Sequence, residues 1–142
     1  MSRDQYLLDN NTLIRLRAEG RHSIMRRVDC HIIEEVAHEA RYLDDVGELE
    51  QMRLSVTTTT LRILQRVMAS LGPDNSLVDL YRNKGNADPL LIASALEKVE
   101  ASETTLLPER WHIVTEDHGL RDAATAFGVR TLSLADFISA TT

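Results

Sequence analysis

Strand-like and helix-like segments alternate along almost the whole chain. The strand candidates are short apolar runs, at Tyr6–Asp9, Cys30–Ile33, Met52–Val56, Trp111–Thr115 and Val129–Ser133. The helix candidates have apolar residues at intervals of three or four, at 11–20, 34–43, 58–71, 76–85, 88–103, 118–127 and 134–140. Gly20 is expected to end the first helix, and Ser133 is a plausible cap for the last. This alternation predicts an α/β fold in which a mostly parallel β-sheet is flanked by α-helices.

Size and composition favour one domain over residues 1–142. The chain is 43% hydrophobic and 27% charged, which is typical of a globular protein with a sizeable core. No apolar run approaches the roughly 18 to 20 residues of a membrane span, and the first residues lack the apolar stretch of a signal peptide. We therefore expect a cytoplasmic protein with no membrane partner. The single cysteine, Cys30, excludes an internal disulfide and a cysteine zinc cluster, and we expect it in the core.

Charge is unevenly distributed along the sequence, although the net value is −6. Residues 1–27 hold six arginines against three acids, whereas residues 29–50 hold eight acids against Arg41 alone. Only two of the sixteen basic residues are lysines. The planar guanidinium suits bidentate contacts with phosphate or carboxylate, so the bias is compatible with nucleic acid or an acidic partner. A bias in genome base composition would produce the same excess of arginine.

Four carboxylates are expected at one edge of this sheet. Asp9 follows the first strand, Asp117 follows the strand Trp111–Thr115, Glu39 lies in the helix after Cys30–Ile33, and Asp88 begins the helix 88–103. Loops at the carboxyl ends of parallel strands converge on one rim, where ligands usually bind. The topology can therefore bring these distant acids into one pocket.

The ordered segments YLLDNNTLI, NADPLLIASAL and IVTEDHGLRDAATAFGVRTLSLADF, with a glutamate in the second helix, resemble the PIN-domain nucleases. The resemblance spans Tyr6 to Phe137 and implies a PIN-like α/β/α sandwich. It implies a metal-dependent ribonuclease that uses Mg²⁺ or Mn²⁺ and cleaves RNA. The metal-binding and catalytic acids would be Asp9, Glu39, Asp88 and Asp117, with Asn11 and Thr115 as polar neighbours.

Small members of that family are often the toxins of toxin–antitoxin pairs, so the resemblance also implies an antitoxin partner and a homodimer. Leu61, Ile63 and Leu64 are candidates for the apolar surface of such contacts. Many toxin members have Asn where this chain has Asp117, which leaves an RNA-processing nuclease without an antitoxin as an alternative. A PIN-like RNA-binding module without catalysis is a further alternative.

Carboxylates suit the implied chemistry. Mg²⁺ prefers hard oxygen ligands at about 2.0–2.1 Å and keeps several waters. The ion polarises the phosphoryl oxygen and lowers the pKa of the attacking water. Four carboxylates around one pocket also repel one another, so at least one should have a raised pKa in the absence of metal.

Each acid also has a purely structural interpretation. Asp9, Asp88 and Asp117 could be helix N-caps, Asp88 especially because Pro89 follows it. Capping and metal binding are compatible, because a capping carboxylate keeps free lone pairs. Glu39, like its neighbour Glu35, could instead belong to a solvated face.

The remaining polar residues near these acids are more ambiguous. Asp122 could reach the site through water or lie on the surface, and His118 and Arg121 could contact substrate or solvent. The five histidines show no zinc-ligand spacing. A receiver domain of the response-regulator type, which also gathers acids around Mg²⁺, expects a lysine after its fifth strand. Lys84 and Lys98 both precede the strand Trp111–Thr115, which disfavours that alternative.

Overall fold

The computed structural model describes residues 3–71 and 87–142, apart from the side chains of Ala87 and Asp88. The helix expected at 76–85 and the preceding GPDN stop lie outside these ranges. No helix in the described ranges is long and apolar enough to cross a membrane.

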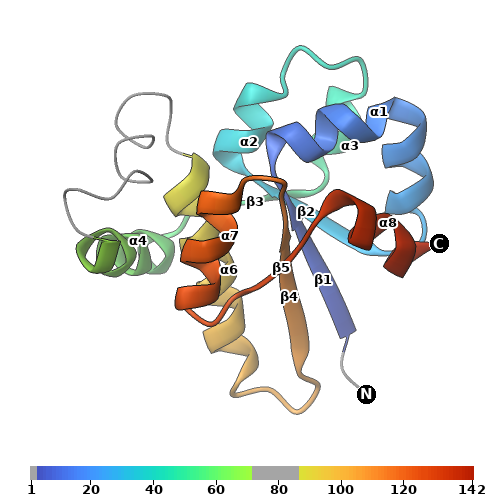
Figure 1. Cartoon of the computed structure of the whole chain (residues 1–142). Helices are drawn as coiled ribbons and strands as arrows, with labels where there is room; N and C mark the ends of the chain where they lie inside the picture. The colour runs from blue at the N-terminus through green and yellow to red at the C-terminus, as the bar shows by residue number, and fades with distance from the viewer. Residues whose placement is uncertain (1–2, 72–86) are drawn as a thin grey trace.

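The described strands form one parallel sheet, in the order β3-β2-β1-β4-β5. The strands are β1 (Arg3–Leu8), β2 (Asp29–Ile33), β3 (Arg53–Leu54), β4 (Glu109–Val114) and β5 (Arg130–Leu132). Each overlaps an expected strand, although β1 begins three residues before the expected Tyr6 and β3 covers only two residues of the expected Met52–Val56. Figure 1 looks onto the β5 edge of this sheet, with the strands running upward toward the rim that carries the candidate acids.

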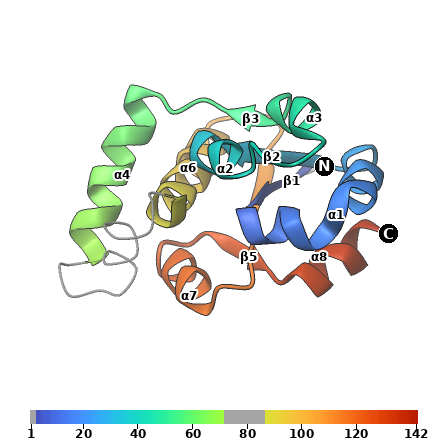
Figure 2. The same ribbon diagram turned by 90° about the horizontal axis from the view of Figure 1, so that it is seen from above.

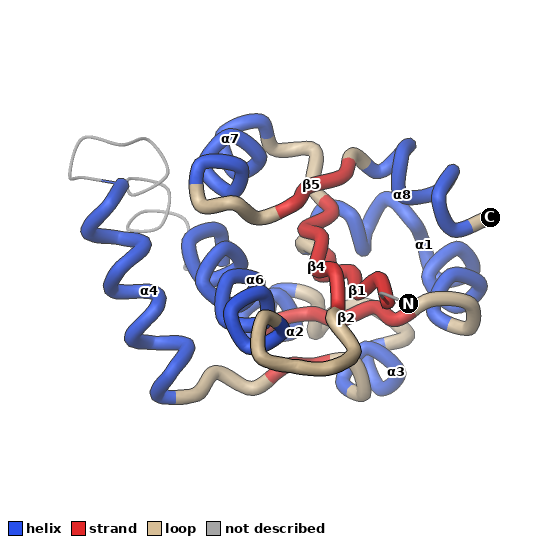
Figure 3. Tube along the Cα trace, turned by 90° about the horizontal axis from the view of Figure 1, so that it is seen from below, coloured by secondary structure: helices blue, strands red, loops and turns tan. Residues whose placement is uncertain are grey.

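Helices cover both faces of the sheet, so the predicted α/β sandwich is confirmed. The described helices are α1 (Asn10–Met25), α2 (Glu34–Glu39), α3 (Val46–Glu50), α4 (Thr58–Leu71), α6 (Ala87–Ser102), α7 (His118–Ala126) and α8 (Leu134–Thr141). Seen from above, α6 and α7 lie on one side of the strands and α1 and α8 on the other, while α4 packs outside α6 (Figure 2). The view from below shows the same two layers (Figure 3).

The core lies between the central strands and these helices. Leu7, Ile32 and Ile113, one from each of β1, β2 and β4, are fully buried. Central parallel strands are covered on both faces, which explains why they read as nearly continuous apolar runs. Cys30 is buried as expected, and burial raises the pKa of its thiol to about 12.

Helix α1 differs from the expectation, because it continues past Gly20 to Met25. It is interrupted instead at Arg17, whose φ of 57° and ψ of 169° are not helical. The buried Arg21 holds the second half in place: its guanidinium donates to Leu13 O at 2.5 Å and to both carboxylate oxygens of Asp45, at 2.5 and 2.7 Å. An arginine that acts as a buried anchor carries no apolar signal, so periodicity could not reveal it.

Two other expectations need correction. The second helix ends at Glu39 rather than Leu43, and the short α3 was not expected. Ile63 and Leu64 are buried, in helix α4 that packs against α6, so their assignment to a surface for partners was wrong. Leu61 is half exposed on the same helix.

Candidate functional site

The strand order reverses between β1 and β4, and the candidate acids gather at that point. From β1 the chain builds outward through β2 and β3, whereas β4 and β5 extend the sheet on the other side. In open α/β sheets, ligands bind at the carboxyl ends of the strands where such a reversal opens a crevice. Leu8 at the end of β1 is the register partner of Val114 at the end of β4. Asp9 and Thr115, the next residue of each strand, are therefore brought together.

Asp9 is the most enclosed of the described candidate acids, with 8% of its surface exposed. It caps α1: its Oδ1 accepts a hydrogen bond from Thr12 N at 2.8 Å. Its Oδ2 accepts from the Thr115 hydroxyl at 2.5 Å. Each oxygen retains acceptor capacity, so the capping role leaves room for a cation.

The Thr115 hydroxyl links Asp9 to Asp117. Thr115 is fully buried, and its Oγ1 donates to Asp9 while accepting from Asp117 N at 3.1 Å. The exposed Asp117 caps α7 through Leu120 N, at 3.0 Å. At Gly119 a Cβ would lie 3.3 Å from Asp117 Oδ1, so the missing side chain gives this carboxylate space. The two acids are thus held by one hydroxyl at the reversal point.

Glu39 ends α2 close enough to Asp9 for the charge of Asp9 to act on it. Its pKa is raised, first by partial burial and then by the negative charges of Glu35 and Asp9, against an opposing effect of His38. The direction agrees with the expectation that at least one acid would have a raised pKa, but burial, rather than repulsion among the four acids, is the largest cause. Because the charge of Glu35 acts on Glu39, Glu35 also lies near the candidate site.

Other acids near the rim have structural roles. Glu116 Oε1 accepts from Leu134 N at 2.7 Å and so fixes the start of α8. Glu34 Oε1 accepts from Val56 N at 3.2 Å. The two acids that follow Thr115 therefore have structural roles at this strand-to-helix junction. Asp117 caps α7, and Glu116 holds the start of α8. Asp122 is exposed, as is His118.

Sequence reasoning missed Asn10, which directly follows Asp9. Its side-chain oxygen is buried and has no hydrogen-bond partner among the described residues. Buried polar atoms are usually paired, so this unpaired amide oxygen, next in sequence to Asp9, is an exception that helix capping does not explain. Asn11, the neighbour that the family resemblance implied, is exposed in the first turn of α1.

The donor set fits Mg²⁺ or Mn²⁺ by type, since it consists of carboxylate and amide oxygens. Across residues 3–71 and the described part of 87–142, no three Asp, Glu, His or Cys side chains gather closely enough to hold a metal ion. Asp88 is the second residue of α6, and its side chain is outside the described part of the chain. The structure therefore brings Asp9 and Asp117 to the same rim and places Glu39 within the field of Asp9, while the role of the fourth acid, Asp88, stays a prediction.

The fold and rim define a parallel α/β protein in which Thr115 links the Asp9 carboxylate to the backbone of Asp117 at the switch point. No protein-family model matches the chain, and no curated protein is similar to it. The resemblance to PIN-domain nucleases therefore stays a prediction from the sequence.

Proposed function

We propose that this protein is a metal-dependent endoribonuclease of the PIN type, which hydrolyses RNA phosphodiester bonds. The observation that carries the proposal is the Thr115 hydroxyl, which holds Asp9 and Asp117 together at the reversal of strand order. Structural capping alone would account for each acid separately. Capping does not explain why the Asp9 carboxylate and the Asp117 backbone N–H, more than a hundred residues apart in sequence, bond to one buried hydroxyl.

Asp9 and Asp117, with Glu39 and Asp88, would hold Mg²⁺ or Mn²⁺. The ion supplies polarisation of the phosphoryl oxygen and an activated water. Thr115 orients the Asp9 carboxylate, and a cation bound beside Glu39 would oppose the effects that raise the pKa of its carboxyl group. The buried Cys30, with its pKa raised to about 12, is unsuited to act as a nucleophile, which favours direct hydrolysis.

The strand order argues against the receiver-domain alternative. Receivers of the flavodoxin-like class have the order 2-1-3-4-5, in which the first strand lies between the second and the third. Here β1 lies between β2 and β4. The Mg²⁺-binding acids of a receiver would therefore sit on differently placed strands.

The proposal includes a biological role as the toxin of a toxin–antitoxin pair. A co-expressed antitoxin would insert an Arg or Lys beside Asp9 and Asp117 and compete with the metal. The toxin would act as a homodimer, for which the exposed Leu61 is a candidate contact. A small open reading frame directly upstream whose product binds and inhibits this protein would support the role. An active nuclease without such a neighbour would instead be an RNA-processing enzyme.

Cleavage of structured RNAs by the purified protein tests the nuclease proposal. We expect cleavage with Mg²⁺ or Mn²⁺, none in EDTA, and a loss of orders of magnitude in Asp9→Asn, because a ligand is removed. Asp122→Asn is the matched control: it removes the same charge from an exposed residue of α7 and should keep activity. Cleavage in EDTA would exclude the metal mechanism. RNA binding without cleavage in any metal would identify an inactive binding module.

A further inference from the structure

A groove of about 510 Å³ opens beside the edge strand β5, outside the carboxylate site. Its lining comes from β4, the end of α7, the following turn and β5, and includes His112, Thr125, Gly128, Arg130 and Thr131. Gly128 has a φ of +78°, and a Cβ there would meet nothing within 4 Å. The turn therefore leaves this wall of the groove low and open to solvent.

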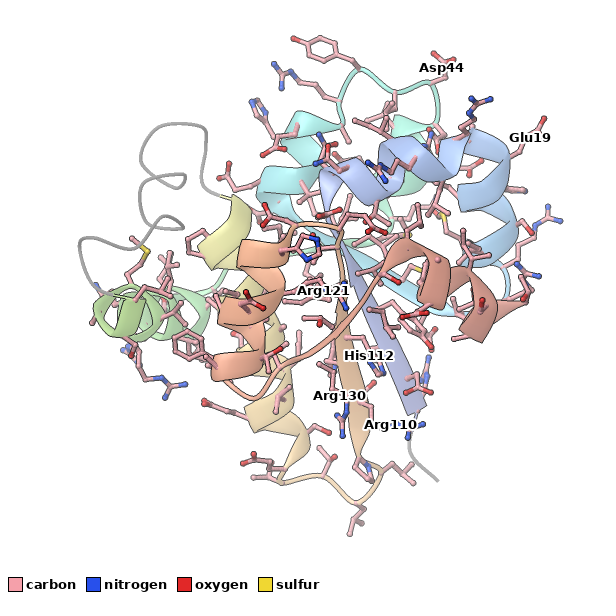
Figure 4. All side chains as sticks on the ribbon, viewed as in Figure 1. Glu19, Asp44, Arg110, His112, Arg121 and Arg130 are labelled. Carbon is pink, nitrogen blue, oxygen red and sulfur yellow. The ribbon has the colours of Figure 1, made fainter. Side chains whose placement is uncertain are left out.

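Basic side chains lie on one face of the sheet, with Arg130 and His112 in this groove and Arg110 beside it. Arg130 on β5 is in register with His112 on β4, and Arg110 shares that face because side chains alternate along a strand. In the view of Figure 4, the labelled side chains of Arg121 on α7, His112 on β4, Arg130 on β5 and Arg110 on β4 appear in this order from top to bottom. Asp4 offsets part of this charge, since its carboxylate pairs with Arg110 Nε at 2.9 Å and His112 Nε2 at 3.0 Å.

Arg130 is the cation that remains available in the groove. It is exposed, and neither Arg130 nor the half-buried Arg121 forms an ion pair with any residue that the structure describes. The hydroxyl-bearing Thr131 follows Arg130 in the lining. A guanidinium with neighbouring hydroxyls is the kind of donor set that contacts phosphate oxygens in nucleic-acid complexes.

The groove lies close to the carboxylates along the same strands. His112 precedes Thr115 by three residues, which corresponds to about 10 Å at the rise of a strand. A polyanion whose reacting phosphate lies among carboxylates needs cations along the rest of its path, because the acids repel it. The groove supplies one such cation, Arg130, at one side of the site.

We propose that this groove binds the phosphate groups of a single RNA strand, with Arg130 as the principal contact. The position of the scissile bond at Asp9 and Asp117 rests on the proposed function, whereas strand binding in the groove does not require cleavage. Positively charged grooves that follow one backbone are typical of single-strand binding. Removing Arg130 should therefore weaken binding for all sequences alike.

Binding of a short fluorescent oligouridylate in EDTA, measured over a series of salt concentrations, tests the groove. In Arg130→Gln we expect weaker binding and a log–log salt slope reduced by about 0.7, which corresponds to one fewer phosphate neutralised on a single strand. Arg130→Lys should restore the slope. Arg27→Gln is the matched control, because it removes the same charge from an exposed residue between α1 and β2. Equal effects of Arg130→Gln and Arg27→Gln would overturn the proposal.

The same variants separate this proposal from the nuclease proposal. If the wild type cleaves RNA while Arg130→Gln and Arg27→Gln bind equally, the groove assignment is wrong and the nuclease stands. If Arg130→Gln selectively loses binding but no metal supports cleavage, the groove stands and the nuclease falls. Failure of the wild type to bind oligouridylate, with binding of polyglutamate that depends on Arg130, would assign the groove to an acidic protein segment and overturn the proposal.

Discussion

At the residue scale, the site depends most on the Thr115 hydroxyl. This group satisfies one oxygen of the buried Asp9 and the backbone N–H of Asp117. The sequence could place Thr115 at the end of a strand, but it could not show that one hydroxyl serves two acids. That relation arises from the pairing of β1 with β4, which joins residues distant in the chain.

Thr115→Val should destabilise the protein by about 1–3 kcal/mol, because the isosteric side chain leaves a buried carboxylate oxygen without its donor. Urea denaturation monitored by circular dichroism measures the change. Thr125→Val is the control, since it removes a hydroxyl that bonds only to Arg121 O within α7, at an exposed position. The control should change stability by less than about 0.5 kcal/mol. Equal losses in both variants would contradict the linking role of Thr115.

Glu39 should make stability depend on pH. Its pKa is raised above the ordinary 4.5 in the folded protein, so the folded state holds this proton more tightly than the unfolded chain. The stabilising effect is fully present below the unfolded pKa and is lost as pH rises through the folded pKa. Glu39→Gln has no carboxyl group to ionise at this position. In EDTA, the stability of this variant relative to the wild type should therefore increase as pH rises above about 4.5.

Thermal melts over a pH series measure this difference. Glu103→Gln, at an exposed position after α6, controls for the change in net charge. A constant difference between Glu39→Gln and the wild type at every pH would contradict the electrostatic account of Glu39.

At the element scale, the sequence predicted most strands and helices because their burial follows simple periods. The strand before Asp9 and the helices capped by Asp9, Asp117 and Ser133 all appear where apolar spacing and capping residues indicated. The prediction that the first helix ends at Gly20 was wrong, because a glycine ends a helix only where the backbone needs a conformation that other residues avoid. In α1 the non-helical backbone conformation is at Arg17, and the ion pair of Arg21 with Asp45 holds the second half of the helix in place.

Arg17→Gly should stabilise the protein by about 1 kcal/mol, because φ near 57° with ψ near 169° is a region that essentially only glycine occupies without strain. Arg62→Gly is the matched control, at an exposed position inside the regular helix α4. There the same substitution should cost about 1 kcal/mol. Chemical denaturation of both variants measures the two signs. A loss of stability in Arg17→Gly similar to that in Arg62→Gly would show that Arg17 adopts ordinary helical geometry.

At the scale of the whole molecule, strand order determines which residues meet. The order β3-β2-β1-β4-β5 brings the ends of β1 and β4 together and leaves β5 as an edge with a cationic groove. The alternation of elements predicted a parallel sheet, and hence a shared rim, but several strand orders satisfy that alternation. Asp9 and Asp117 could therefore be assigned to the rim from sequence, whereas the groove at Arg130 could not.

The central claim is that Asp9 and its neighbouring acids form one site for a divalent cation. The most direct measurement is the melting temperature of the wild type, Asp9→Asn and Asp122→Asn, each in EDTA and in excess Mg²⁺. A ligand that binds only the folded state raises the melting temperature. We predict that Mg²⁺ stabilises the wild type and Asp122→Asn to the same extent and leaves Asp9→Asn nearly unchanged. Equal stabilisation of all three proteins, or of none, would contradict the claim and leave Asp9 and Asp117 as helix caps alone.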